Sequence, residues 1–308
     1  MKIFGSLLTG FYRALKSLKG VLIAWLTMFF LVIVFIYPLR GSLSSAFGSS
    51  MITEKLVQGF DVEVFADLGS ALGSLLSFIT AGFIMIYFIG FVLNAFLTAG
   101  LFGSVRNGNE KFSAQEFFRA GSKNFWPFLI ISLIITVIIV IIIGILMVVP
   151  IAIITMSDST AEKTRITVLI ASGAVNLLLM PIFLLIADYS RAWKTAHEEE
   201  SFFRAIGFGF SHTFSKFLSS YIMMVLLILS QMIFGIIVLI FLPDWRPVTG
   251  SGVFLLLIIS QLLLLTRLLL KTWRYASVTS LMEETTLTIP ENINSIQYEQ
   301  GRSNQTEG

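Results

Sequence analysis

The sequence predicts an all-α membrane protein with six transmembrane helices, built as three hairpin repeats that are each preceded by a cytoplasmic amphipathic interfacial helix. Three observations support this prediction. Hydrophobic residues make up 56% of the 308 residues and charged residues only 13%, and the mean hydropathy is +0.88, which is too apolar for a soluble domain with a polar surface. Apolar runs of transmembrane length recur along the chain, and the basic residues gather on one side of them.

Six apolar runs are each long enough to cross a hydrocarbon core of roughly 30 Å as a helix of about 20 residues. They divide the chain into a cytoplasmic amphipathic segment at 1–20, a six-helix transmembrane domain at 21–276 and a disordered polar cytoplasmic tail at 277–308. The expected spans are Val21–Tyr37, Leu75–Phe102, Trp126–Thr155, Ile166–Ala187, Phe217–Leu242 and Val253–Lys271.

Lysine and arginine are unevenly distributed between the two sides of the expected bundle. The N-terminal segment, the second connection, the fourth connection, and the end of the sixth span with its tail carry sixteen of them, whereas the other connections carry five. Because basic loops stay in the cytoplasm, both termini are expected there. The basic balance therefore reports topology and not nucleic-acid binding.

A short motif relates the connections on the basic side. The string Phe-Phe-Arg-Ala occurs twice, and in each case its arginine follows by 13 residues an arginine that ends an even-numbered span. A degenerate copy, Phe-Tyr-Arg-Ala, begins at Phe11, and the sixth span ends at an arginine in the corresponding place. We therefore predict three units of the same orientation, each a basic segment followed by a helical hairpin. The residues that define these elbows are Arg106, Phe117, Phe118, Arg119, Arg191, Phe202, Phe203, Arg204 and Arg274.

Each elbow has the composition of a helix that lies in the headgroup layer, with aromatic rings among acyl chains and basic groups facing anionic phosphates. In the first internal copy, Ser113 and Glu116 fit a capping box, and Phe112 and Phe117 fit the accompanying hydrophobic staple. Two interpretations stay open. The segment is either an interfacial elbow that links two spans, or a surface that contacts lipids or partner proteins as part of the function.

Neutral polar residues occur deep in the expected spans. Asn94, Asn176 and Gln261 precede the arginines at the ends of their spans by 12, 15 and 13 residues, which places them roughly 18–23 Å inward. Gln231 on the fifth span is a fourth such residue. Unsatisfied amides are costly in the membrane, so we expect hydrogen bonds between helices, with a polar substrate path as the alternative.

The sixth span carries a basic stripe. Arg267, Lys271 and Arg274 follow one another at spacings of four and three residues, which places them on one helical face. Arg267 lies deepest, about 10 Å inside Arg274, and is expected to need a partner. Asp188, near the cytoplasmic end of the fourth span, is the expected partner, and an anionic lipid headgroup is the alternative.

The sequence offers no catalytic constellation. Glu199-Glu200 with Arg204, and Phe208 with His212, resemble signatures of the CAAX-protease-like membrane metalloproteases, but those signatures lie on different helices in that family and require a further histidine. This chain has no cysteine and only two histidines, which is a poor basis for a metal site. We therefore expect no catalytic residue, no metal, no cofactor and no enzymatic activity.

The pattern of six spans with Arg…Phe-Phe-Arg-Ala elbows resembles a group of bacterial membrane proteins related to the membrane domain fused to some glycerophosphodiester phosphodiesterases. The resemblance covers the membrane region and carries over no catalytic residue. We expect a non-enzymatic multi-pass protein of the bacterial cytoplasmic (inner) membrane, a scaffold or accessory subunit that organises lipids or partner proteins. The alternative is a transporter of a lipid-like or small amphipathic solute. Expected partners are membrane lipids and other membrane proteins, and not nucleic acid.

Overall fold

The computed structural model describes residues 2–47, 69–108, 111–155, 162–241 and 249–287. Every element in these ranges is a helix. Six helical segments are long and apolar enough to cross a membrane, which confirms the predicted number of spans and supports a multi-pass membrane protein.

Each of three shorter helices is followed by two spans along the chain. The third span is a continuous rod of three elements, in which a π-helical turn separates two α-helices. The spans are α2 (Leu18–Phe47), α5 (Gly69–Arg106), α7 (Phe125–Ile143) with η1 (Gly144–Val148) and α8 (Val149–Thr155), α9 (Glu162–Ala196), α11 (Phe217–Phe241) and α12 (Gly250–Leu287). The shorter helices are α1 (Lys2–Lys16), α6 (Ala114–Lys123) and α10 (Phe202–Ser215).

Serine residues cap the N-termini of two of the shorter helices, α6 and α10. The Ser113 hydroxyl accepts a hydrogen bond from the backbone N–H of Glu116 and caps α6, and Ser201 caps α10 in the same way. The rings of Phe112 and Phe117 lie 6.3 Å apart, which confirms the staple. The Glu116 carboxylate, however, accepts from the side chain of Asn107.

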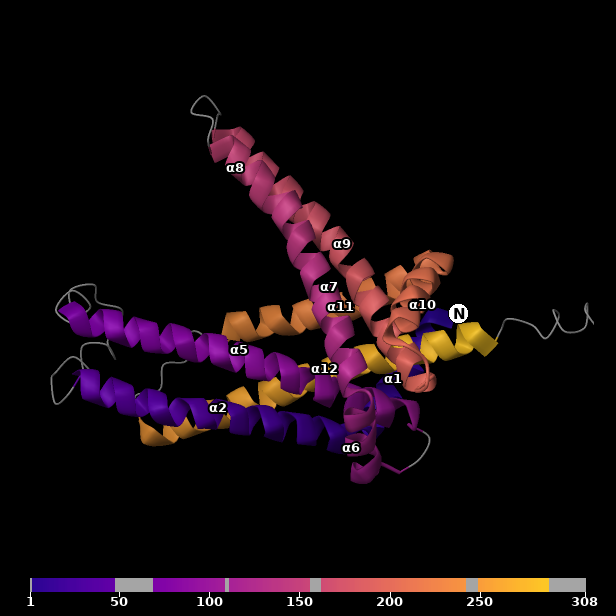
Figure 1. The fold of residues 1–308 in the computed structure, drawn as a ribbon, viewed down its shortest axis with the longest axis horizontal. Helices are drawn as coiled ribbons and strands as arrows, with labels where there is room; N and C mark the ends of the chain where they lie inside the picture. Colours follow the sequence, from indigo (N-terminus) through magenta and orange to yellow (C-terminus); the bar gives the residue numbers. More distant parts are fainter. Residues whose placement is uncertain (1, 48–68, 109–110, 156–161, 242–248, 288–308) are drawn as a thin grey trace, which may run out of the picture.

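The spans form two groups that diverge from a common base. Helices α2, α5, α11 and α12 run along one direction, whereas α7, η1, α8 and α9 form a separate arm that points away from them (Figure 1). The two groups meet where the shorter helices lie. In the most apolar stretch of each span, no more than 22% of the residues are buried, so the protein core is confined to this base.

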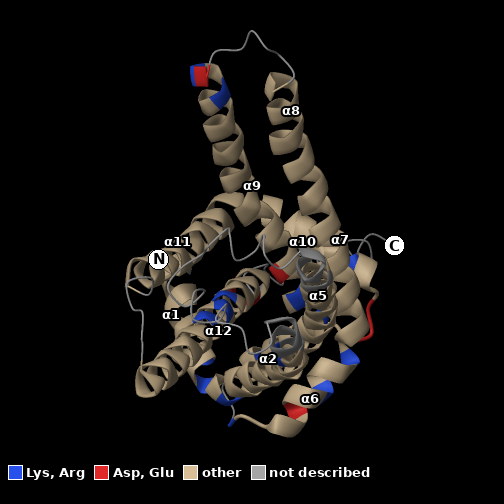
Figure 2. Ribbon diagram, turned by 90° about the vertical axis from the view of Figure 1, so that its left-hand side faces the viewer, with Lys and Arg blue, Asp and Glu red and all other residues tan. Residues whose placement is uncertain are grey.

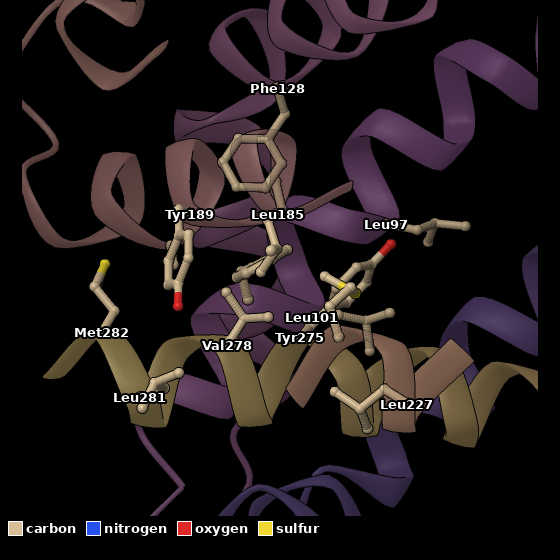
Figure 3. Close-up of a cluster of buried hydrophobic side chains, with 14 of the residues drawn as sticks. Leu97, Leu101, Phe128, Leu185, Tyr189, Leu227, Tyr275, Val278, Leu281 and Met282 are labelled. Atoms are coloured by element: carbon tan, nitrogen blue, oxygen red, sulfur yellow. The ribbon is translucent and has the colours of Figure 1, made fainter. Parts of the chain in front are cut away.

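Aromatic residues from several spans fill the core at the base. The ring of Phe102 stacks on Tyr275 at 4.5 Å and meets the edge of Phe128 at 5.7 Å. Leu185 and Tyr189 of α9 pack into the same cluster (Figure 3). Burial of these side chains fixes the ends of α5, α7, α9 and α12 against one another.

Each short helix packs mainly on the end of the second, fourth or sixth span, which are α5, α9 and α12. Helix α6 packs on α5 and α10 on α9, while α1 packs along the C-terminal part of α12. The backbones come very close at these contacts. A Cβ atom at Gly10 would lie 2.6 Å from the Cα of Ser277, and one at Gly209 would lie 2.5 Å from the carbonyl oxygen of Ile186.

Helix α12 extends beyond residue 276, where the sequence analysis placed the start of a disordered tail. Residues 277–287 continue the helix, because Ser277, Val278 and Leu281 are buried in the contact region with α1. The remainder of the expected tail, 288–308, lies outside the described residues.

Candidate functional site

A buried charged network joins three spans at the base. The carboxylate of Asp188 on α9 is fully buried and lies 3.1 Å from Nη1 of Arg191 and 2.8 Å from Nε of Arg274 on α12. Arg191 also donates a hydrogen bond of 2.9 Å to the hydroxyl of Ser132 on α7. A carboxylate in this environment is tolerated because two guanidinium groups compensate its charge.

The expected pairing of Asp188 with Arg267 is wrong. Arg274 occupies that place, and Arg267 lies seven residues away, about 10 Å along the same helix. The prediction treated Arg274 as an interfacial residue at the end of its span. Because α12 runs on to Leu287 under the cover of α1, Arg274 is only 9% exposed and faces the interior.

The next cation in the stripe pairs with one of the predicted amides. Lys271 donates a hydrogen bond of 2.7 Å to the side-chain carbonyl of Asn94 on α5. Its ammonium group also lies 5.8 Å from the ring centroid of Tyr275, and the Arg274 guanidinium lies 5.2 Å from the same centroid. The basic stripe thus supplies contacts from α12 to both α5 and α9.

The remaining amides behave in three different ways. Gln261 accepts a hydrogen bond of 3.1 Å from the indole N–H of Trp25 on α2, so the expected interhelical bonds are confirmed for Gln261 and Asn94. Asn176 instead donates to the carbonyl of Ser172 in its own helix, because a carbonyl four residues earlier is always within reach. The side-chain nitrogen of Gln231 is buried and makes no hydrogen bond to any residue in the described ranges.

The two phenylalanines of α6 point in different directions. Phe117 is fully buried and Phe118 is 47% exposed, whereas the sequence analysis placed both aromatic residues in the membrane interface. Phe117 packs at the close contact with Gly100 of α5. On α10, Phe203 is 69% exposed and its ring lies 4.2 Å from that of Phe202.

The elbow arginines make contacts of different kinds. Arg106 donates a hydrogen bond of 2.5 Å to the backbone carbonyl of Thr195 on α9, whereas Arg119 is exposed on α6. Arg204 pairs with Glu200 at 2.7 Å on the surface. The equivalence in sequence does not extend to their bonding partners.

An ion pair links α6 to the connection that follows α9. The Lys123 ammonium lies 2.5 Å from a carboxylate oxygen of Glu198 and 3.4 Å from one of Glu199. The hydrogen bond from Lys123 lowers the pKa of Glu198. No three histidine, aspartate or glutamate side chains come together in a possible metal site within the described ranges.

A groove between α9, α11 and α12 is a feature that the sequence does not predict. Its volume is about 650 Å³, and its walls are mainly leucine, isoleucine and methionine side chains of the three helices. Four polar residues also line it, namely Gln231, Ser260, Arg267 and Arg274. Two of these were singled out as intramembrane polar residues on α11 and α12, but nothing in the sequence indicates that α9 approaches them.

No protein-family model matches the chain, and no curated protein sequence or solved structure is significantly similar to it. The resemblance to the membrane domain of glycerophosphodiester phosphodiesterases therefore rests on the elbow pattern alone. The features of the molecule that bear on function are the charged network, the groove and the exposed apolar surfaces of the spans.

Proposed function

We propose that this chain is a non-enzymatic multi-pass protein of a bacterial cytoplasmic (inner) membrane that acts as a scaffold or accessory subunit and organises lipids or partner proteins. The observation that carries the proposal is the divergence of the two helix groups. Residues such as Val140 on α7 and Ile170 on α9 are 62% and 65% exposed. Apolar faces of this extent require lipid or another membrane protein as their surroundings.

The three short helices would form the cytoplasmic, amphipathic part of three repeated units. In every copy of the motif the second aromatic residue is exposed, by 59% at Tyr12, 47% at Phe118 and 69% at Phe203. The alanine two positions later is fully buried at Ala14 and Ala205. The N-terminal helix α1 would complete the third unit by packing on α12, as α6 packs on α5 and α10 on α9.

This arrangement suits a helix that rests in the headgroup layer. One side of each short helix packs on its span, while an aromatic ring and neighbouring cations remain available to lipid. Basic residues gather on α6 and along α12, whereas α7, η1 and α8 carry none and the far end of α9 carries Lys163 and Arg165 (Figure 2). The position of this basic end in the cytoplasm follows from the positive-inside rule.

The alternative, a transporter of a lipid-like or small amphipathic solute, is favoured by one specific feature. The groove between α9, α11 and α12 combines apolar walls with cationic residues, which suits an amphipathic molecule. A scaffold that holds lipid and a protein that moves lipid would both need such a groove, so movement has to be measured directly.

The test is to purify the protein in lipid nanodiscs cut directly from the membrane and to identify the retained lipids and proteins by mass spectrometry. The proposal expects a lipid class or a partner protein enriched over a six-span membrane protein purified in parallel. Retention of bulk lipid only, without enrichment of any lipid or protein, would overturn it. Transfer of a fluorescent lipid between the leaflets of reconstituted vesicles would establish the transporter instead.

A further inference from the structure

Cations outnumber acids in the membrane-embedded region around the groove. Asp188 is paired with Arg191 and Arg274, and Lys271 has a neutral partner in Asn94. Arg267 makes no ion pair or hydrogen bond within the described part of the chain. It lies about 10 Å closer to the membrane centre than Arg274, where an uncompensated cation is costly.

A second donor without an acceptor lines the same groove. The side-chain nitrogen of Gln231 on α11 is buried and has no partner among the residues that the structure describes, and Gln231 and Arg267 both contribute to the lining. The Ser260 hydroxyl donates to the carbonyl of Leu256 in its own helix, and within the described residues it accepts no hydrogen bond from the side-chain nitrogen of Gln231. The groove therefore presents two hydrogen-bond donors, one of them positively charged, and no described residue supplies an acceptor for them.

The rest of the groove is apolar and large enough for part of a lipid. Leu177, Met180 and Leu184 form the wall on α9, and Met232 and Val238 belong to the wall on α11. The volume of about 650 Å³ lies in the middle of the range for small-molecule sites, roughly 300–1,000 Å³. No charged residue occurs on α11, so the wall suits acyl chains and not a free hydrated anion.

We propose that the groove between α9, α11 and α12 binds a membrane lipid with an anionic headgroup, whose charge pairs with Arg267 and whose acyl chain lies along α9 and α11. The inference rests on the proposed lipid-organising function and names the lipid class and its site. Gln231 donates a second hydrogen bond to the headgroup. Because Arg267 lies closer to the membrane centre than Arg274, the headgroup of the bound lipid lies deeper in the membrane than the headgroups of the surrounding leaflet.

The first test measures retained lipid by native mass spectrometry after incubation with vesicles of phosphatidylcholine and phosphatidylglycerol. Wild-type protein should retain phosphatidylglycerol in preference to phosphatidylcholine. Arg267→Leu should reduce this retention roughly tenfold or more, because charge-assisted hydrogen bonds to the headgroup are lost, whereas Arg267→Lys should keep part of it. Arg40→Leu, which removes an exposed arginine on α2, is the matched control and should leave retention unchanged.

The second test fills the groove without touching the charges. A Cβ atom at Gly235 on α11 would meet no other atom within 4 Å, and Gly235 lines the groove. Gly235→Phe should therefore fold normally and displace the lipid. Gly173→Phe on α9 also enters open space, but it lies outside this groove and should have no effect on the retained lipid.

Three results would overturn the inference while leaving the proposed function intact. The first is equal retention of phosphatidylglycerol by Arg267→Leu and wild-type protein, and the second is unchanged retention by Gly235→Phe. The third is displacement of the lipid by inorganic phosphate at low concentration, which would assign Arg267 to a soluble anion. Failure of the proposed function appears differently, as the absence of any enriched lipid or protein in the wild-type preparation.

Discussion

Asp188 determines how two spans meet, because it is the only acidic residue that is buried in the described part of the chain. Its two arginines come from different helices, one from its own turn of α9 and one from α12. An ion pair of this kind adds little net stability compared with apolar packing, but removing one partner leaves the other charges buried without compensation. The network therefore fixes the position of α9 against α12.

We expect Asp188→Leu to lower the free energy of unfolding by about 3 kcal/mol or more, because the buried Arg274 and the partly buried Arg191 lose their counter-charge. Arg274→Leu in the Asp188→Leu background should recover part of this loss. Glu200→Leu, which breaks the exposed pair with Arg204, is the control and should change stability by less than about 1 kcal/mol. Unfolding curves in mixed micelles measure all of these effects. Equal stability of Asp188→Leu and Glu200→Leu would show that the network is not needed.

His212 on α10 should make stability depend on pH. Burial, and secondarily the charge of Lys216, lowers the pKa of His212 below its ordinary value of 6.5. Between the two pKa values the unfolded chain binds a proton that the folded protein does not, so the free energy of unfolding should fall as the pH drops below about 6.5 and stay constant above it. His212→Phe keeps an aromatic ring beside Phe208, which His212 stacks on at 5.1 Å, and should remove this contribution.

The control for this prediction replaces the other histidine. His197 is exposed at the end of α9, and His197→Phe should preserve the decline in stability below pH 6.5. Midpoints of thermal unfolding measured from pH 5 to 8 compare the three proteins. A parallel decline in His212→Phe and wild-type protein would assign the pH dependence to other groups.

Two glycines of α10 differ in their surroundings, so alanine substitutions at them test two different effects, the close packing of α10 on α9 and the helix propensity of α10. A Cβ atom at Gly209 would lie 2.5 Å from the carbonyl oxygen of Ile186 and would overlap the hydroxyl of Ser190, whereas one at Gly207 would meet nothing within 4 Å. We expect Gly209→Ala to push α10 away from α9 and to cost about 1–3 kcal/mol of unfolding free energy. Gly207→Ala should stabilise the same helix by roughly 0.5–1 kcal/mol.

Thermal unfolding and limited proteolysis within α10 test this pair of variants. Gly209→Ala should expose α10 to the protease sooner than wild-type protein, and Gly207→Ala should protect it. Equal behaviour of the two variants would mean that α10 does not dock closely on α9.

The sequence predicts the number of helices well and their ends less well. The starts of α7 and α11 lie within one residue of the expected positions, because a polar residue interrupts the chain just before each apolar run. The ends of α9 and α12 lie well beyond the expected ones. Their basic and polar residues resemble an exposed interface in sequence, but the short helices α10 and α1 cover them.

The sequence predicts how deep a polar residue lies along its span better than it predicts the hydrogen-bond partner of that residue. Interhelical hydrogen bonds are expected for four amides in the spans, and Asn94 and Gln261 make them. Asn176 instead bonds within its own helix, and the nitrogen of Gln231 has no partner in the described residues. That Lys271 and Trp25 are the donors depends on how the helices rotate against one another. Spans that carry apolar residues on every face, such as α7 and α11, have no continuous polar stripe that would indicate this rotation.

In the whole molecule, the arm of α7, η1, α8 and α9 could not be predicted from the sequence for the same reason. The apolar surface of α7 does not indicate which neighbouring helix it packs against. The angle of the arm to the other spans is set at the base, where Phe128 and Leu185 join the shared core (Figure 3). Residues of α9, α11 and α12 line the groove, so its shape depends on the angle of α9. The distribution of lysine and arginine along the chain, by contrast, can be read from the sequence alone, and it predicts the orientation of the spans.

Helices α1, α6 and α10 and the C-terminal part of α12 lie together at the base (Figure 1), and we predict that this end is cytoplasmic. Because the chain contains no cysteine, each introduced cysteine reports alone. Position 199 is suited to this, since the Glu199 side chain is 93% exposed, whereas Lys194 is buried and would give no clear signal. Lys163 is exposed at the start of α9, at the far end of the arm.

In intact cells, a membrane-impermeant maleimide should label a cysteine at position 163 and leave one at position 199 unlabelled. From the sequence, sixteen of the 21 lysines and arginines are assigned to the same side as position 199, and basic segments are retained in the cytoplasm. Permeabilised cells should show labelling at both positions, which confirms that each cysteine is accessible. Labelling of position 199 but not position 163 in intact cells would invert the topology and place the basic short helices outside, where the anionic lipids of the cytoplasmic leaflet cannot reach them.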